Sequence, residues 1–141
     1  MWRMDMRERI QQANIASYAA WNGHDPDGVA AIFASDAQSV DVTSGVITRG
    51  RDAIRAVAVD RFTGFPDFSL ERQMSLIDGN TTSDQWIMRA THTGDYMGLE
   101  PTGRPIEVCG ATFSEFDDDG LVVRDTQYVD VPALLRQLGL D

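Results

Sequence analysis

The spacing of apolar residues changes once along the chain, directly after Pro66. Before this residue the apolar positions recur every three or four residues, as on one face of a helix. After it they alternate with polar residues, as in a half-buried strand. A chain with helices first and a run of strands afterwards is typical of an α+β domain, in which helices cover one face of an antiparallel sheet. We therefore predict an α+β fold.

Three helices and one strand are predicted before Pro66. Asn22-Gly23 ends the first helix. Asp25-Pro26 starts the second, because an aspartate side chain can cap free N–H groups and proline fits the first helical turn. The predicted elements are a helix over 6–22, a short helix that begins at 26 and includes Val29, Ile32 and Phe33, a strand over 37–42, a turn-rich return over 45–50 and a helix over 53–62.

Four strands and a closing helix are predicted after Pro66. Asp78-Gly79-Asn80 and the run from Asp117 to Gly120 have the composition of turns between antiparallel strands. Asp130 is suited to cap the last helix. The predicted elements are strands over 68–76, 83–93, 106–116 and 121–129, and a helix over 131–138.

The composition is that of one globular domain over residues 1–141, with 43% hydrophobic and 24% charged residues. The 22 acidic and 12 basic residues give a net charge of -10, so nucleic acid and anionic membranes are disfavoured as partners. No apolar run approaches the roughly 20 residues of a membrane span, and the first residues lack the apolar core of a signal peptide. We expect a cytoplasmic protein.

Metal ligands are sparse in this sequence. Cys109 is the single cysteine and there are two histidines, which are too few for a dedicated zinc site. The run Asp117 to Asp119 lacks the spaced ligands and distal glutamate of a calcium loop. We therefore expect no metal site.

Five segments carry a family resemblance: Trp-Asn-Gly-His-Asp at 21–25, Val-Ala-Ala-Ile-Phe-Ala-Ser-Asp-Ala at 29–37, Thr-His-Thr-Gly-Asp-Tyr-Met-Gly at 91–98, Pro-Thr-Gly-Arg at 101–104 and Leu-Leu-Arg-Gln-Leu-Gly at 134–139. In this order they resemble the nuclear transport factor 2-like superfamily and, within it, the SnoaL-like polyketide cyclases. The resemblance implies a cone of strongly curved antiparallel sheet, three N-terminal helices packed on it and a short C-terminal helix. It also implies an apolar cavity for a small hydrophobic molecule and a homodimer formed through the outer sheet face.

The resemblance implies three catalytic candidates. Asp41 lies where ketosteroid isomerases carry their general base, although a solvent-facing aspartate is the alternative. Thr112 lies where the isomerases have an aspartic acid and the cyclases a histidine; its hydroxyl can donate to an oxyanion, or it fills space as an ordinary strand residue. Gln127 takes the place of the cyclases' catalytic aspartate, and its amide can orient a carbonyl or water but cannot exchange a proton.

Limonene-type epoxide hydrolases of the same superfamily need acids that this chain lacks. Arg89 matches that family's arginine, but Thr91 and Gln127 stand at its two acid positions. Epoxide hydrolysis by that mechanism is therefore disfavoured.

Substrate binding is assigned to further residues on the expected cavity walls. Asp125 shares the strand face of Gln127 and is a candidate for the missing acid, unless it pairs with a neighbouring arginine. His92 has an ordinary pKa near neutrality, but it is also explained as a hydrogen-bonded loop residue. The aromatic candidates are equally typical of a core. The assigned residues are Tyr18, Trp21, Trp86, His92, Val108 and Asp125.

Two functions remain open from the sequence. The first is a cofactor-independent enzyme that moves a proton on a hydrophobic carbonyl compound, such as a polyketide, terpenoid or steroid-like molecule, in an isomerisation or an aldol-type cyclisation. The proton-transfer group would be Asp41, Asp125 or His92. The second is a binding or accessory protein without chemistry, which the loss of acids at Thr91, Thr112 and Gln127 favours.

Overall fold

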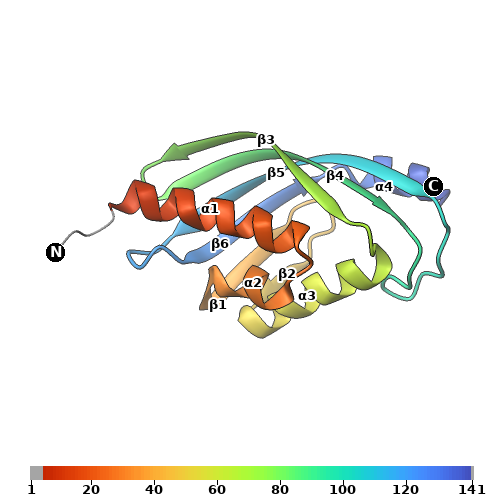
Figure 1. Cartoon of the computed structure of the whole chain (residues 1–141), viewed down its shortest axis with the longest axis horizontal. Coiled ribbons are helices and arrows are strands. Elements are labelled where there is room, and N and C mark those ends of the chain that lie inside the picture. The colour runs from red at the N-terminus through yellow and green to blue at the C-terminus, as the bar shows by residue number, and fades with distance from the viewer. Residues whose placement is uncertain (1–4, 141) are drawn as a thin grey trace.

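The computed structural model of the protein describes residues 5–140 and shows helices gathered beneath an arched sheet (Figure 1). The predicted bounds of the first and last helices match the structure, and the order of elements is confirmed. In chain order the elements are α1 (Met6–Asn22), α2 (Pro26–Ala31), β1 (Phe33–Asp41), β2 (Ile47–Arg49), α3 (Arg51–Gly64), β3 (Ser69–Asp78), β4 (Thr81–Thr91), β5 (Pro105–Phe116), β6 (Val122–Val129) and α4 (Val131–Leu138).

Aspartates begin three of the four helices. The carboxylates of Asp5, Asp25 and Asp130 each accept a backbone N–H three residues further on, at the start of α1, α2 and α4. Such a cap satisfies N–H groups that have no partner inside the helix. Gly139 ends α4 in the left-handed conformation, at φ 75°.

The six strands form one mixed sheet in the order β2-β1-β6-β5-β4-β3. All neighbours are antiparallel except β1 and β6, which are parallel. The purely antiparallel sheet expected from the sequence is therefore wrong at this one pairing. The last strand, β6, follows β5 after a turn and pairs with it in the antiparallel direction. On its other side β6 pairs with β1, and these two strands run in the same direction.

Local differences from the predicted elements lie around β1. The residue Phe33 belongs to β1 and not to the second helix, which ends at Ala31. Phe33 pairs with Val122 of β6, so tertiary pairing overrides the helical spacing of residues 29–33. The expected turn-rich return contains the short edge strand β2, which pairs with β1.

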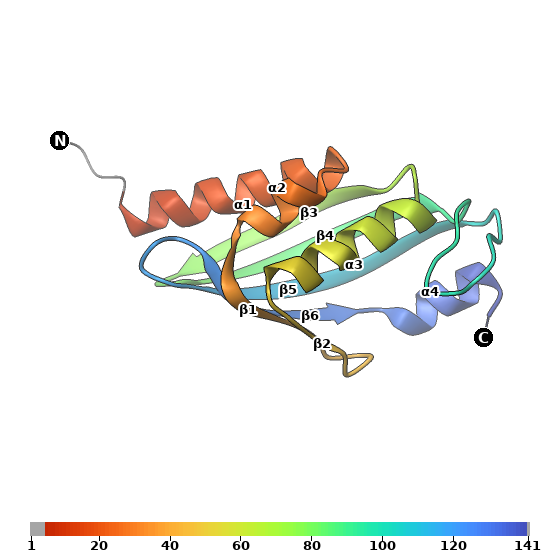
Figure 2. The same ribbon diagram turned by 90° about the horizontal axis from the view of Figure 1, so that it is seen from below.

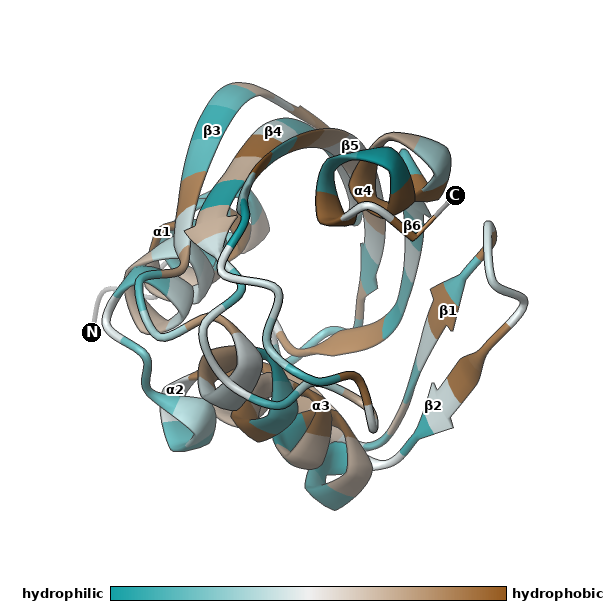
Figure 3. Cartoon of the chain, turned by 90° about the vertical axis from the view of Figure 1, so that its right-hand side faces the viewer, coloured by the Kyte–Doolittle hydropathy of each residue, from teal (hydrophilic) through white to brown (hydrophobic). Residues whose placement is uncertain are grey.

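Strand irregularities accompany the curvature of the sheet. The register shifts in β1 between Phe33 and Gln38, and in β3 between Arg72 and Met74. A bulge of this kind bends its strand and increases the local twist. The sheet runs from β3 across to β1 and β2 as an arch, and α1, α2 and α3 complete the ring (Figure 3). Seen from below, α1 and α3 run along the concave face (Figure 2).

Two apolar clusters hold the helices on the sheet. One contains Phe65, Phe68, Trp86 and Met88, with Leu138 of α4 packed among them. The other contains Ile10, Phe33, Phe116 and Val122, near the start of α1. No helix within residues 5–140 has the length and apolar character needed to cross a membrane.

Candidate functional site

A cavity of about 410 Å³ lies between the concave face of the sheet and helices α1 and α3. Its sheet wall is built by alternation, because every second residue of a strand points to the same face. In β4 these positions are buried from Thr82 to Ala90. The space is that of a small organic ligand.

Strand register aligns the polar cavity residues in two rows. In the first row Asp84 of β4 pairs with Thr112 of β5, Thr112 with Gln127 of β6, and Gln127 with Asp41 of β1. In the second row the corresponding residues are Thr82, Ser114, Asp125 and Ser39. All eight residues line the cavity. The three predicted catalytic residues therefore lie side by side across the sheet.

The remainder of the cavity wall is mainly apolar and aromatic. Trp86 is buried on β4, and its Nε1 donates to Oγ1 of Thr112 over 2.9 Å. The indole lies against Gly110, where an added Cβ would come within 2.3 Å of the ring. Tyr18 and Trp21 of α1, two of the predicted substrate-binding residues, also line the cavity. Further apolar lining comes from Phe65, Phe68, Leu70, Met88 and Val129.

Asp125 is the most buried acid of the cavity wall, with 6% of its surface exposed. Burial raises the pKa of its carboxyl from 3.8 to about 6, an effect that Ser39, Gln127 and the charge of Arg61 partly offset. Its Oδ1 has no hydrogen-bond partner among the described residues. The expected alternative, an ion pair with an arginine, is not found within residues 5–140. The carboxyl can therefore exchange a proton near neutral pH.

Asp84 is a second buried acid of the cavity, on β4. Its carboxylate accepts hydrogen bonds from the Asn14 amide, at 2.9 and 3.1 Å, from the Tyr18 hydroxyl at 3.2 Å and from the Ser75 hydroxyl at 2.6 Å. Burial raises the pKa of the Tyr18 phenol, and the nearby Asp84 charge adds to this effect, so Tyr18 stays a donor. This cluster fixes α1 to the sheet.

Asp41 lies at the rim of the cavity and is half-buried. Its Oδ1 accepts the backbone N–H groups of Thr43 and Ser44, at 3.0 and 3.2 Å. The side chain thus closes the turn that follows β1, as Asx turns do. Gln127 beside it is half-buried, and its Nε2 donates to Oγ of Ser39 over 3.4 Å.

Two predicted substrate-binding residues lie outside the cavity wall. Val108 is 1% exposed and belongs to the core cluster that also contains Leu138 of α4. His92 follows β4 and is completely buried; its Nδ1 lies 3.2 Å from the backbone N of Thr102, which donates to it. Its ring packs on Phe65. His92 therefore anchors the segment between β4 and β5, which is the loop role that the sequence left open.

The pattern of the SnoaL-like polyketide cyclase family matches residues 11–138, nearly the whole chain. The chain belongs to this family. The cone-shaped α+β fold expected from the resemblance is therefore confirmed, with the parallel β1–β6 pair as the one departure.

Solved structures with the same fold come from several bacteria. IdmH, a proposed polyketide cyclase from Streptomyces antibioticus, is 26% identical, with a TM-score of 0.78 over 92% of this chain and 98% of that chain. A proposed SnoaL-like polyketide cyclase from Jannaschia sp. CCS1 is 17% identical, with a TM-score of 0.86 over 100% and 99%. AclR, a proposed hydroxylase from Streptomyces galilaeus, is 24% identical, with a TM-score of 0.83 over 97% and 88%. No curated protein matches the chain.

The cavity residues of this SnoaL-like chain that were not predicted from the sequence include three with polar or charged side chains, Asn14, Arg61 and Asp84. Asp84 has the same alternation as Trp86 and Met88, so its inward position could have been read from the strand pattern. Arg61 lies one helical turn after Val57, which also lines the cavity. Charged side chains are usually solvated, so residue type alone gives no reason to place Arg61 or Asp84 in a cavity.

The chemistry that these residues offer is proton transfer and hydrogen bonding. No group of three or more His, Cys, Asp or Glu side chains within residues 5–140 is arranged to hold a metal ion. The cavity instead offers one acid that titrates near neutrality, hydroxyl and amide groups beside it, and an aromatic wall.

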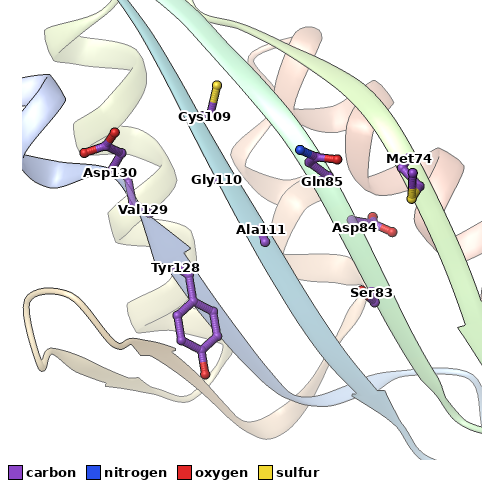
Figure 4. Close-up of a pocket in the computed structure, with 10 residues that line it drawn as sticks. All are labelled: Met74, Ser83, Asp84, Gln85, Cys109, Gly110, Ala111, Tyr128, Val129 and Asp130. Atoms are coloured by element: carbon purple, nitrogen blue, oxygen red, sulfur yellow. The ribbon is translucent and has the colours of Figure 1, made fainter.

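The outer face of the sheet carries a shallow open groove. Figure 4 shows Met74, Gln85, Cys109 and Tyr128 on the side of the sheet turned away from the helices. Exposed apolar side chains continue on this face at Leu76 and Phe113. Asp84 and Val129 are among the lining residues of both this groove and the cavity.

Proposed function

We propose that the protein is a cofactor-independent enzyme that transfers a proton on a small hydrophobic carbonyl compound. The ionised carboxyl of Asp125 takes a proton from the carbon next to the carbonyl, and the electron pair of the C–H bond moves to the carbonyl oxygen as an enolate. Returning the proton to a different carbon gives isomerisation. Attack of the same carbon on a second carbonyl gives aldol-type cyclisation, and the alkoxide formed from that carbonyl takes the proton back from Asp125.

The observation that carries this proposal is the position of Asp125. It is a buried acid on the cavity wall, with a raised pKa and one carboxyl oxygen that has no partner among the described residues. A group with a pKa close to the working pH is suited to both accept and return a proton. Asp41 fits this role less well, because it is only half-buried and its Oδ1 accepts two N–H groups of its own turn.

Two neighbouring groups support the same chemistry. Thr112 accepts the indole N–H of Trp86 and so has its own O–H available for a ligand oxygen. Gln127 lies two residues beyond Asp125 on the same strand face and can orient a carbonyl or a water. The aromatic wall suits a ring system such as a polyketide, terpenoid or steroid-like skeleton.

The test compares Asp125→Asn with Asp41→Asn in an assay for solvent proton exchange on enolisable cyclic ketones. We expect Asp125→Asn to lower kcat at least 100-fold, because an amide cannot exchange the proton, while ligand affinity is retained. Asp41→Asn should leave kcat within about threefold, since an amide oxygen can also accept the N–H groups of the turn. The reverse ranking would assign the proton transfer to Asp41.

A binding protein without chemistry is the second function that the family resemblance leaves open. Titration calorimetry on the wild type separates it from the enzyme. Tight binding of cyclic ketones, together with no solvent proton exchange above the background rate, would establish a binding protein and would contradict the proposed enzyme.

We propose in addition that two copies of the chain associate through the outer sheet face. The support is the row of exposed apolar side chains, Met74, Leu76, Phe113 and Tyr128, on the face opposite the helices. Light scattering at micromolar concentration should give twice the mass of 15.6 kDa, and a monomer mass would contradict the proposal.

A further inference from the structure

Arg61 is the one basic side chain among the described residues that line the cavity. It lies in the last turn of α3, on the wall across from the sheet. Its guanidinium carbon is 5.2 Å from the centroid of the Trp21 ring, a separation typical of a cation–π contact. This contact holds the flat guanidinium group against an aromatic wall of the cavity.

The guanidinium of Arg61 has no ion pair or side-chain hydrogen bond within residues 5–140. Other arginines of the same helix differ in this respect. Arg51 donates to the carbonyl of Phe33, and Arg55 pairs with Asp27 at 2.7 Å. An arginine has five N–H donors in a fixed fork, so Arg61 has donors available for a ligand.

The acids of the cavity do not neutralise Arg61. The Asp84 carboxylate accepts from Asn14, Tyr18 and Ser75. Oδ1 of Asp41 accepts from the backbone of its own turn. Asp60 precedes Arg61 on α3 but forms no ion pair with it. The charge of Arg61 opposes the rise in the pKa of Asp125, but the two side chains form no ion pair. The free cation and the free acid therefore face the same cavity.

We propose that Arg61 binds the carbonyl oxygen of the substrate and stabilises the negative charge that forms on this oxygen when Asp125 removes the proton. The ligands of this site are compounds with an enolisable carbonyl or an equivalent oxyanion attached to an apolar ring. The inference rests on the proposed proton transfer and adds the group that binds the oxygen. The proton moves from carbon to Asp125, the electron pair moves to the oxygen beside Arg61, and both return in the product.

Charge-assisted hydrogen bonds from a preorganised donor are a main source of stabilisation for such an oxyanion. The hydroxyl of Thr112 and the amide of Gln127 are neutral, so they offer weaker bonds than a guanidinium. Arg61 is therefore the strongest hydrogen-bond donor among the described side chains that line the cavity.

The experiment measures binding, not turnover, with two ring compounds of nearly equal size. 4-Nitrophenolate carries an oxyanion on an aromatic ring, and 4-nitroanisole has the same ring with a neutral ether. Titration calorimetry at pH 8.5 gives both affinities for the wild type, for Arg61→Gln and for the control Arg55→Gln, which changes an exposed arginine of the same helix. Calorimetric unfolding shows that each variant is folded.

We expect the wild type to prefer 4-nitrophenolate, and Arg61→Gln to lose on the order of tenfold to a hundredfold in affinity for it. Binding of 4-nitroanisole should stay within about twofold, and Arg55→Gln should change neither value. If Arg61→Gln does not fold, Arg61→Lys replaces it; it keeps a cation without the fork and should lose about threefold or more for the phenolate alone.

Two results would overturn the role of Arg61. One is an unchanged affinity for 4-nitrophenolate in Arg61→Gln. The other is an equal loss for both probes, which would mean that Arg61 only packs on Trp21. Neither result depends on Asp125. Conversely, full activity of Asp125→Asn would remove the proposed proton transfer while leaving the binding result intact.

Discussion

Asp84 and Asp125 are two aspartates on the same concave face, with nearly equal exposure of 8% and 6%. Asp84 accepts hydrogen bonds from three side chains on α1 and β3. Asp125 has an oxygen without any partner among the described residues, and burial raises its pKa to about 6. Two similarly buried aspartates of one cavity therefore have different surroundings. We call Asp84 and its three donors the Asp84 corner, and Asp125 with its unpartnered oxygen the Asp125 corner.

The difference shows that hydrogen-bond donors decide what a buried carboxyl does. A carboxylate surrounded by donors is stabilised in its charged form and serves as a structural joint. A carboxyl without sufficient donors loses its hydration without compensation, and its proton becomes available near neutral pH. The Asp84 corner therefore stabilises the fold, whereas the Asp125 corner is destabilising when charged and suited to chemistry.

The largest expected effect comes from removing the structural corner. Asp84→Ala leaves the Asn14 amide and the Tyr18 and Ser75 hydroxyls without their shared acceptor. Unsatisfied buried donors are costly, so we expect the free energy of unfolding to fall by about 2–4 kcal/mol. Urea unfolding at pH 7 measures this change.

Tyr18→Phe is the matched control, because it removes a single donor and keeps the ring in place. Its cost should be about 1 kcal/mol. If Asp84→Ala is no more destabilising than Tyr18→Phe, water replaces the missing carboxylate. The hydrogen bonds of the Asp84 corner would then not contribute the stability that distinguishes it from the Asp125 corner.

The fold could be predicted from the sequence because its signals are local. The helical spacing and the caps at Asp25 and Asp130 determine where helices begin, and the two-residue period identifies β3 to β6. The parallel pairing of Ser39 with Asp125 could not be predicted in this way. Such pairing depends on how segments 86 residues apart meet in space, which no local pattern encodes.

For the polar residues of β5 and β6, strand alternation and the family resemblance agreed. Thr112 and Gln127 were expected on the inner face and lie there side by side. Asp84 was missed, since its partners Asn14 and Tyr18 come from a distant helix and its environment depends on tertiary packing. The roles of Asp41, Thr112 and Gln127 in catalysis stay predictions.

The corner of Asp125 should respond to pH in the opposite sense to an ordinary salt-bridged acid. Its pKa is about 6 in the folded chain, against 3.8 for an ordinary aspartate such as that of the unfolded chain. The folded protein therefore binds the proton more tightly than the unfolded chain does. The resulting stabilisation is complete below pH 3.8 and is lost as the pH rises through 6. Asp125→Asn removes this dependence. At pH 8 the variant should be more stable than the wild type by roughly 2–3 kcal/mol, and the difference should shrink toward zero near pH 4. Urea unfolding of both proteins across this range measures it. A difference in the free energy of unfolding that does not change with pH would mean that residue 125 is solvated. The Asp125 corner would then not be destabilised by its charge.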